Sequence, residues 1–202
     1  MKTILYKIPF ALLYSRLLVA VLLIVFSFTN TSSLVIIGLC VYAIISDVLD
    51  GMIARRLKIS TVEMRQMDTK IDTVFWFSCL FYLSVNQHAF IKSHILELFM
   101  LVFSELFIIL FGLVKFRERI SFHTLLSKFW ALVLLWFFID LLLGNTAYIS
   151  FKIAFWYGLL VQAEILAIAL ILKSNQPDIP GILQAINCRK GLPVKRNRFF
   201  NG

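Results

Sequence analysis

Apolar residues along this chain fall into six long runs separated by short polar connections. Each run approaches the ~20 residues that an α-helix needs to cross the hydrocarbon core of a bilayer. A backbone in lipid must satisfy its own hydrogen bonds, so runs of this length indicate helices. The sequence therefore predicts an all-α, polytopic membrane protein with six transmembrane helices, at roughly residues 8–28, 33–54, 66–86, 94–114, 123–143 and 148–172.

Composition agrees with this pattern and excludes a soluble domain. Of the 202 residues, 60% are hydrophobic and only 15% are charged, and the mean hydropathy is +0.89. Soluble domains of this length are about half apolar and about a quarter charged. The apolar excess is therefore assigned to helices that face lipid and one another.

The basic residues lie almost entirely on one side of the predicted helices. Of the 20 Lys and Arg residues, only Lys92 and Lys152 belong to the other side. Because basic residues collect in cytoplasmic connections, this asymmetry places both termini in the cytoplasm of a multi-pass cell-membrane protein. The net charge of +9 has the same origin, so nucleic acid is not an expected partner. Membrane lipids and phosphorylated substrates suit this charge better.

The chain changes character after residue 173. Residues 1–173 form the predicted six-helix transmembrane domain, and residues 174–202 form a basic cytoplasmic tail interrupted by proline and glycine. Within the tail, Ile182, Leu183 and Ile186 have the spacing of a short interfacial helix turn. A partly ordered basic arm is the alternative, and the one that the composition of the tail favours.

Four aspartates lie at the cytoplasmic ends of the second and third predicted helices. Asp47 and Asp50 are three residues apart, and Asp68 and Asp72 are four apart, so each pair shares one helix face. A short basic loop makes the two helices antiparallel neighbours, and their acidic faces are expected to meet. Carboxylates in a membrane helix cost of the order of several kcal/mol unless they are paired or hydrated.

Positive charge must lie between four carboxylates that meet in this way. Divalent cations such as Mg²⁺ prefer oxygen ligands and fit this requirement. Two such ions about 3.5–4 Å apart are the arrangement that assists phosphoryl displacement. Gly51 leaves room for a phosphate or a backbone to approach, and Arg55 offers a bidentate phosphate contact.

The segment from Asp47 to Asp72 reads Asp-x2-Asp-Gly-x2-Ala-Arg-x8-Met-x3-Asp-x3-Asp. It resembles the signature of the CDP-alcohol phosphotransferases, in which glycine stands at the position of Met64. The other seven of the eight fixed positions match, and every spacing is kept. A weaker likeness to the first-helix pattern of the family falls on Pro9 and Arg16. Methionine fills space that glycine would leave open, so the departure at Met64 affects the expected nucleotide geometry.

The resemblance implies a reaction and its site residues. Asp47, Asp50, Asp68 and Asp72 would hold two divalent ions, Mg²⁺ or Mn²⁺, and Asp72 would also be the general base. The residues that would border the CDP moiety are Asp47, Gly51, Ala54 and Arg55. A CDP-alcohol, above all CDP-diacylglycerol, would give its phospho-alcohol group to a small alcohol acceptor, with release of CMP, in phospholipid biosynthesis. Members of the family are commonly homodimers, and a homodimer is therefore expected.

Further polar residues suggest where the acceptor alcohol binds. Glu105 lies within the fourth apolar run, and the basic residues Arg117, Arg119 and Lys128 lie near the fourth and fifth runs. Together they form a candidate acceptor pocket, and their charge favours a phosphorylated acceptor. Membrane orientation alone explains the three basic residues equally well.

Two other functions agree with parts of the sequence. A non-catalytic member of the same family would bind nucleotide or lipid without turnover, and Met64 is the residue that favours it. An ion-coupled transporter would also place acidic residues in membrane helices. It would, however, place them near the bilayer midplane and show a repeat between halves, and the sequence shows neither.

Overall fold

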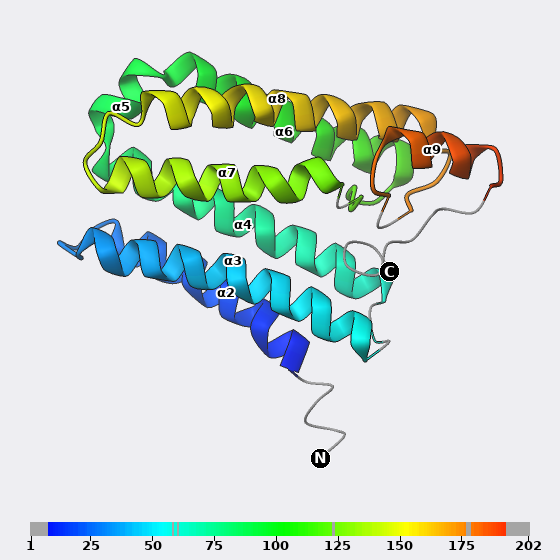
Figure 1. Cartoon of the computed structure of the whole chain (residues 1–202), viewed down its shortest axis with the longest axis horizontal. Helices are drawn as coiled ribbons and strands as arrows, with labels where there is room; N and C mark the ends of the chain where they lie inside the picture. Colours follow the sequence, from blue (N-terminus) through cyan, green and yellow to red (C-terminus); the bar gives the residue numbers. More distant parts are fainter. Residues whose placement is uncertain (1–7, 58, 60, 123, 177–178, 193–202) are drawn as a thin grey trace. The chain divides into compact units, whose positions relative to one another are not determined.

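The computed structural model describes residues 8–57, 59, 61–122, 124–176 and 179–192. Every long element in these ranges is a helix and none of these residues belongs to a strand, which confirms the predicted all-α class. Figure 1 shows the helices, which are α2 (Ile8–Phe26), α3 (Ser33–Arg56), α4 (Val62–Asn86), α5 (His88–Ser93), α6 (Ile95–Phe116), α7 (Leu125–Leu142), α8 (Tyr148–Ile171) and α9 (Ile182–Arg189).

Five of the described helices are long and apolar enough to cross a membrane, namely Ile8–Phe26, Ser33–Ala54, Ile95–Phe116, Leu125–Leu142 and Tyr148–Ile171. The helix α4 covers the expected span 66–86 but is not among them. Its first half carries charged residues that lower its hydropathy, namely Glu63, Arg65, Asp68, Lys70 and Asp72. Six spans and the cytoplasmic placement of both termini therefore stay predictions.

The first of two compact units comprises the described residues up to Ile95 together with Leu141–Asn145. Within this unit, α2 packs along both α3 and α4 (Figure 1). The buried face of α2 contains residues three or four positions apart, the spacing of one side of a helix, and includes Pro9, Leu13, Arg16, Ala20 and Leu23. A positive charge therefore lies within an otherwise apolar face that packs on two neighbouring helices.

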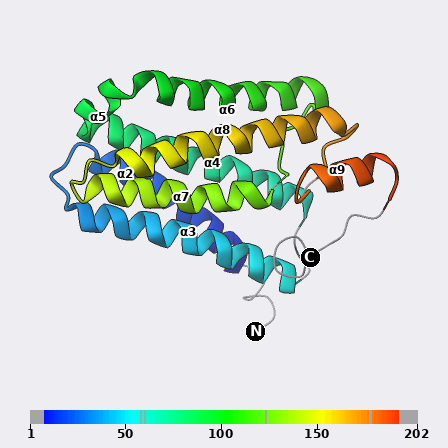
Figure 2. The same ribbon diagram turned by 45° about the horizontal axis from the view of Figure 1, so that its top comes forward.

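The second unit contains Leu96–Asp140 and the described residues from Thr146 onward. Its three long helices, α6, α7 and α8, reverse direction one after another (Figure 2). Gly158 of α8 allows a close approach to α7, because a Cβ added there would lie 2.7 Å from the ring of Trp130. The same indole donates from Nε1 to the carbonyl of Ala154 at 3.0 Å. Trp130 therefore joins α7 to α8 through both packing and a hydrogen bond.

The helix α9 lies in the region predicted to be a basic tail. Its residue Ala185 is fully buried in an apolar cluster whose other members include Ile108, Phe122, Ile168, Leu172 and Ile179. Arg189 donates from Nη1 to the carbonyl of Ile171 at 3.0 Å, at the C-terminal end of α8, where cations are favoured. The described part of the tail thus contains a packed helix, which includes the turn expected from Ile182 to Ile186 and leaves Leu183 exposed.

The close approach at Gly158 can be tested by substitution. Gly158→Ala places a methyl group against the Trp130 ring, so the ring and its hydrogen bond to Ala154 must shift. We expect a loss of about 1–3 kcal/mol in the free energy of unfolding, as for other overpacked cores. The control is Gly38→Ala, because a Cβ at Gly38 meets nothing within 4 Å. Thermal unfolding in detergent should show a lower midpoint for Gly158→Ala alone; equal losses would contradict this packing.

Candidate functional site

The four aspartates are positioned by the end of α3 and the first half of α4. Asp47 and Asp50 lie in the last turns of α3. The helix α4 begins after Thr61, whose side-chain oxygen accepts a hydrogen bond from the Met64 amide at 3.1 Å. This N-cap satisfies one of the amides that a helix leaves unpaired at its start. It fixes where α4 begins and therefore the direction in which Asp68 projects.

The structure brings the predicted aspartates together. Carboxylate oxygens of Asp47, Asp50 and Asp68 all lie within 4.8 Å of one another, close enough to hold a metal ion. Asp72 belongs to the same cluster, because it shares a cation with these three residues. We call these four residues the aspartate cluster.

The shared cation is the guanidinium of Arg16, from the buried face of α2. Its Nη1 donates to Asp47 at 2.6 Å and also to Asp72, and its Nη2 donates to Asp50 at 2.8 Å and also to Asp68. Each nitrogen therefore joins one carboxylate of α3 to one carboxylate of α4. Arg16 links three helices through charge-assisted hydrogen bonds, the stronger class of hydrogen bond in proteins.

The aspartate cluster is buried on one side and open on the other. The side chain of Asp50 is 2% exposed and that of Asp68 is 13% exposed, whereas Asp72 and Asp47 reach 32% and 39%. An ion or a substrate therefore has access from the side of Asp47 and Asp72. The oxygen-only donor set fits Mg²⁺ or Mn²⁺, and one guanidinium leaves the four carboxylates short of positive charge.

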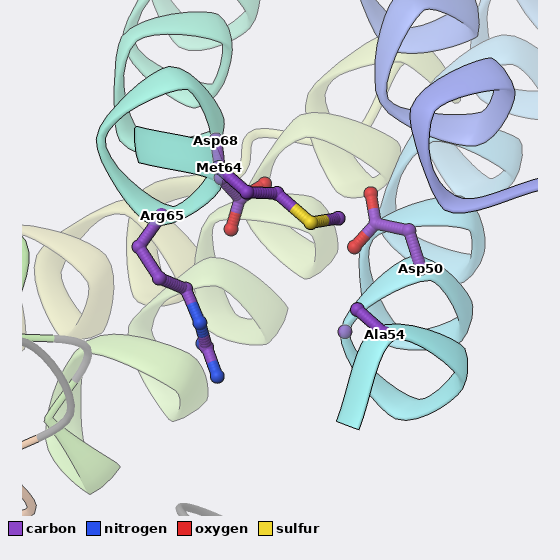
Figure 3. A pocket seen from close by; sticks show the side chains of 6 residues that line it. Asp50, Ala54, Met64, Arg65 and Asp68 are labelled. Carbon is purple, nitrogen blue, oxygen red and sulfur yellow. The ribbon is translucent and has the colours of Figure 1, made fainter. Parts of the chain in front are cut away.

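A small pocket opens beside the cluster, lined by Asp50, Gly51, Ala54, Met64, Arg65 and Asp68. Figure 3 shows the Met64 side chain reaching from α4 toward Asp50 and Ala54 of α3. The Met64 residue is only 6% exposed, so its thioether fills part of the space between the two helices. The pocket is thus lined both by Gly51 and Ala54, which are predicted to border a nucleotide, and by Met64, which stands where the family signature has glycine.

The remaining predicted site residues have different positions. The side chain of Arg55 lies outside the described part of the structure. Glu105 interacts electrostatically with Arg119, and both belong to the second unit. Partial burial lowers the pKa of the Arg119 guanidinium, while the nearby Glu105 carboxylate opposes that shift. Arg117 is exposed, and Lys128 lies in the first turn of α7, so their part in an acceptor pocket stays a prediction.

The sequence did not identify Arg16 as a member of the site. It appeared only as an interruption of the first apolar run and as a weak match to a first-helix pattern. A usable signal existed, because a charged residue in a membrane helix normally has an oppositely charged or polar partner. The four aspartates and the one arginine within the first apolar runs could have been matched on that ground.

The sequence model of the CDP-alcohol phosphatidyltransferase family matches residues 6–173, more than half of the chain. No curated protein and no solved structure matches the chain significantly. The matched range includes the aspartate cluster, Arg16 and the pocket.

The N-cap of α4 gives a test of how the site is positioned. Thr61→Ala removes the side-chain acceptor for the Met64 amide, so we expect the free energy of unfolding to fall by about 1 kcal/mol. The control is Thr29→Ala, which removes an exposed hydroxyl from the connection between α2 and α3. Chemical unfolding in detergent measures both variants. An unchanged stability in Thr61→Ala, or an equal loss in both, would show that the cap does not hold the start of α4.

Proposed function

The chain belongs to the CDP-alcohol phosphatidyltransferase family, a family of transferases, and from this premise we propose that it transfers the phosphatidyl group of CDP-diacylglycerol to a small alcohol and releases CMP. The observation that carries the proposal is the convergence of Asp47, Asp50, Asp68 and Asp72 beside a pocket. These are the residue types and spacings that the reaction of the family requires. The product would enter phospholipid biosynthesis.

The aspartate cluster would hold two divalent cations, Mg²⁺ or Mn²⁺. All its donor atoms are oxygens, and carboxylate oxygens of Asp47, Asp50 and Asp68 lie within 4.8 Å of one another. Both this donor set and the excess of negative charge in the cluster support the binding of cations. Bound cations would neutralise the charge that develops on the phosphoryl oxygens during the reaction.

Asp72 is the proposed general base. With its side chain 32% exposed, its carboxylate can be reached by an acceptor hydroxyl from the open side of the cluster. The hydroxyl proton moves to an Asp72 carboxylate oxygen as the acceptor oxygen bonds to the β-phosphorus of the CDP-alcohol. The bond between that phosphorus and the oxygen bridging to CMP breaks, and CMP leaves with the bonding electrons. A positioned base typically contributes about 10²–10⁴-fold to such a step.

The CDP moiety would lie along the end of α3. Gly51 and Ala54 line the pocket next to Asp50, and their small side chains leave the helix surface open to a nucleotide. In this assignment Asp47 also borders the nucleotide, and Arg55 contacts its phosphates. Arg65 lines the same pocket and adds positive charge for a diphosphate.

The acceptor is proposed to bind near Glu105, Arg117, Arg119 and Lys128. Support comes from the interaction of Glu105 with Arg119, and three basic residues would suit an alcohol that carries a phosphate. Charge asymmetry along the chain supports a reaction at the cytoplasmic side of the cell membrane, with both termini on that side and α4 as a sixth span. A homodimer is proposed from the family premise.

Met64 favours a second candidate function, a family member that binds a nucleotide or a lipid without turning it over. The buried thioether occupies part of the pocket at the position where the family signature has glycine. The complete aspartate cluster favours catalysis, and the two candidates differ in one observable, the release of CMP.

CMP release from the purified protein in lipid, with CDP-diacylglycerol, Mg²⁺ and a panel of alcohols, tests the proposed reaction. We expect CMP to depend on one acceptor and to fall by about 10²-fold or more in Asp72→Asn, since the proton acceptor is lost. The control is Glu63→Gln, an exposed acidic residue in the first turn of the same helix, which should retain activity. No CMP with any acceptor or CDP-alcohol would favour the non-catalytic candidate.

A second test concerns the pocket. Met64→Gly removes the buried thioether, so we expect CMP to bind several-fold more tightly, measured by isothermal titration calorimetry in the presence of Mg²⁺. The control, Met67→Gly, carries the same helix-weakening change at a residue that is 38% exposed. Weaker CMP binding in Met64→Gly than in Met67→Gly would show instead that the thioether contributes to the nucleotide site.

A further inference from the structure

Arg16 contacts all four carboxylates of the aspartate cluster. Its two terminal nitrogens divide the aspartate cluster into two pairs, Asp47 with Asp72 and Asp50 with Asp68. Each nitrogen lies between one carboxylate of α3 and one of α4. Arg16 contacts one oxygen of each carboxylate, and cations bound by the same four carboxylates would compete for the space that its guanidinium occupies.

The charges of this arrangement do not balance. When all four aspartates are ionised, they carry four negative charges against the single positive charge of Arg16. A guanidinium cannot lose its proton in a protein, so Arg16 always contributes that charge. The uncompensated charge attracts further cations, but one oxygen of each carboxylate already accepts a hydrogen bond from Arg16.

The third nitrogen of the side chain is left without an acceptor. Arg16 is 1% exposed, and its Nε is buried without a hydrogen-bond partner. A buried donor without an acceptor is destabilising. The attraction of the four carboxylates therefore holds the guanidinium in a place where its Nε has no acceptor. Once bound cations neutralise the carboxylates, this attraction weakens and the unsatisfied Nε favours movement of the side chain out of the cluster.

We propose that Arg16 is the resident counter-ion of the aspartate cluster in the cation-free protein and that it competes with divalent cations for the same carboxylates. The inference rests on the proposed function, in which the cluster holds Mg²⁺ or Mn²⁺. Arg16 holds α3 and α4 together while the cluster is free of metal ions. Arg16 moves away from the carboxylates when cations bind. Because this competition weakens cation binding, a higher cation concentration is needed to fill the site. Arg16 is in this sense a positioning residue.

Mn²⁺ binding, measured by the electron paramagnetic resonance signal of free Mn²⁺ in a titration of lipid-embedded protein, tests this competition. Arg16→Gln removes the competing charge, so we expect at least about a tenfold tighter Mn²⁺ affinity than in the unchanged protein, the change that corresponds to about 1.4 kcal/mol. Arg16→Lys keeps the charge but loses the planar fork that contacts four carboxylates, and an intermediate affinity is expected. The control is Arg56→Gln, which removes an exposed positive charge at the end of α3 and should leave the affinity within about threefold.

Stability supplies a second readout that does not depend on activity. In EDTA, Arg16→Gln should unfold at a lower temperature than the unchanged protein, because four carboxylates then face one another without a cation. Saturating Mn²⁺ should restore most of that loss. If Arg16→Gln does not fold in EDTA, purification in Mn²⁺ and the Arg16→Lys titration still provide the comparison.

The outcomes separate this inference from the proposed function. Mn²⁺ binding that Arg16→Gln and Arg16→Lys leave unchanged or weaken would overturn the competition and leave the proposed reaction standing. Mn²⁺ binding in neither the unchanged protein nor the variants would overturn both the competition and the metal requirement. Binding that appears only after Arg16 is replaced would support the competition in its strongest form.

Discussion

The repulsion among four carboxylates is the constraint on which the first unit of this protein depends. Asp47 and Asp50 come from α3, Asp68 and Asp72 come from α4, and Arg16 of α2 contacts all four. Without a cation between them, α3 and α4 would be driven apart at the point where the site is built. The buried arginine in the apolar face of α2 supplies this positive charge, and three helices meet around it.

The same constraint prepares the site for chemistry. Asp50 is almost fully buried, whereas Asp47 and Asp72 are about a third exposed, so the cluster has a fixed inner side and an accessible outer side. Fixed carboxylates that lack enough positive charge favour the binding of cations, and preorganised charge of this kind stabilises phosphoryl displacement. The pocket next to Asp50 and Asp68 is the proposed place of the nucleotide.

Features that depend on spacing along one helix could be predicted from the sequence. The helical class, the position of most long helices and the pairing of aspartates on shared faces follow from periodicity and run length. The meeting of the α3 and α4 aspartates followed from the short loop between these helices, whereas spacing within α2 does not reveal which helix Arg16 faces. The direction of Met64 and the packing of Ala185, on the buried face of α9, depend on tertiary structure in the same way. For α4, run length indicated a membrane span, whereas its charged first half leaves it less apolar than the other five.

In the proposed reaction an acceptor hydroxyl, and not water, displaces CMP from a CDP-alcohol at the aspartate cluster. The most direct test is mass spectrometry of the products of turnover with CDP-diacylglycerol and its acceptor in ¹⁸O-labelled water. Transfer predicts equal amounts of CMP and a new phosphodiester lipid, both without the label. Label in CMP or in the lipid phosphate would show hydrolysis, and the absence of CMP would show that no turnover occurs; either result would contradict the proposed transfer.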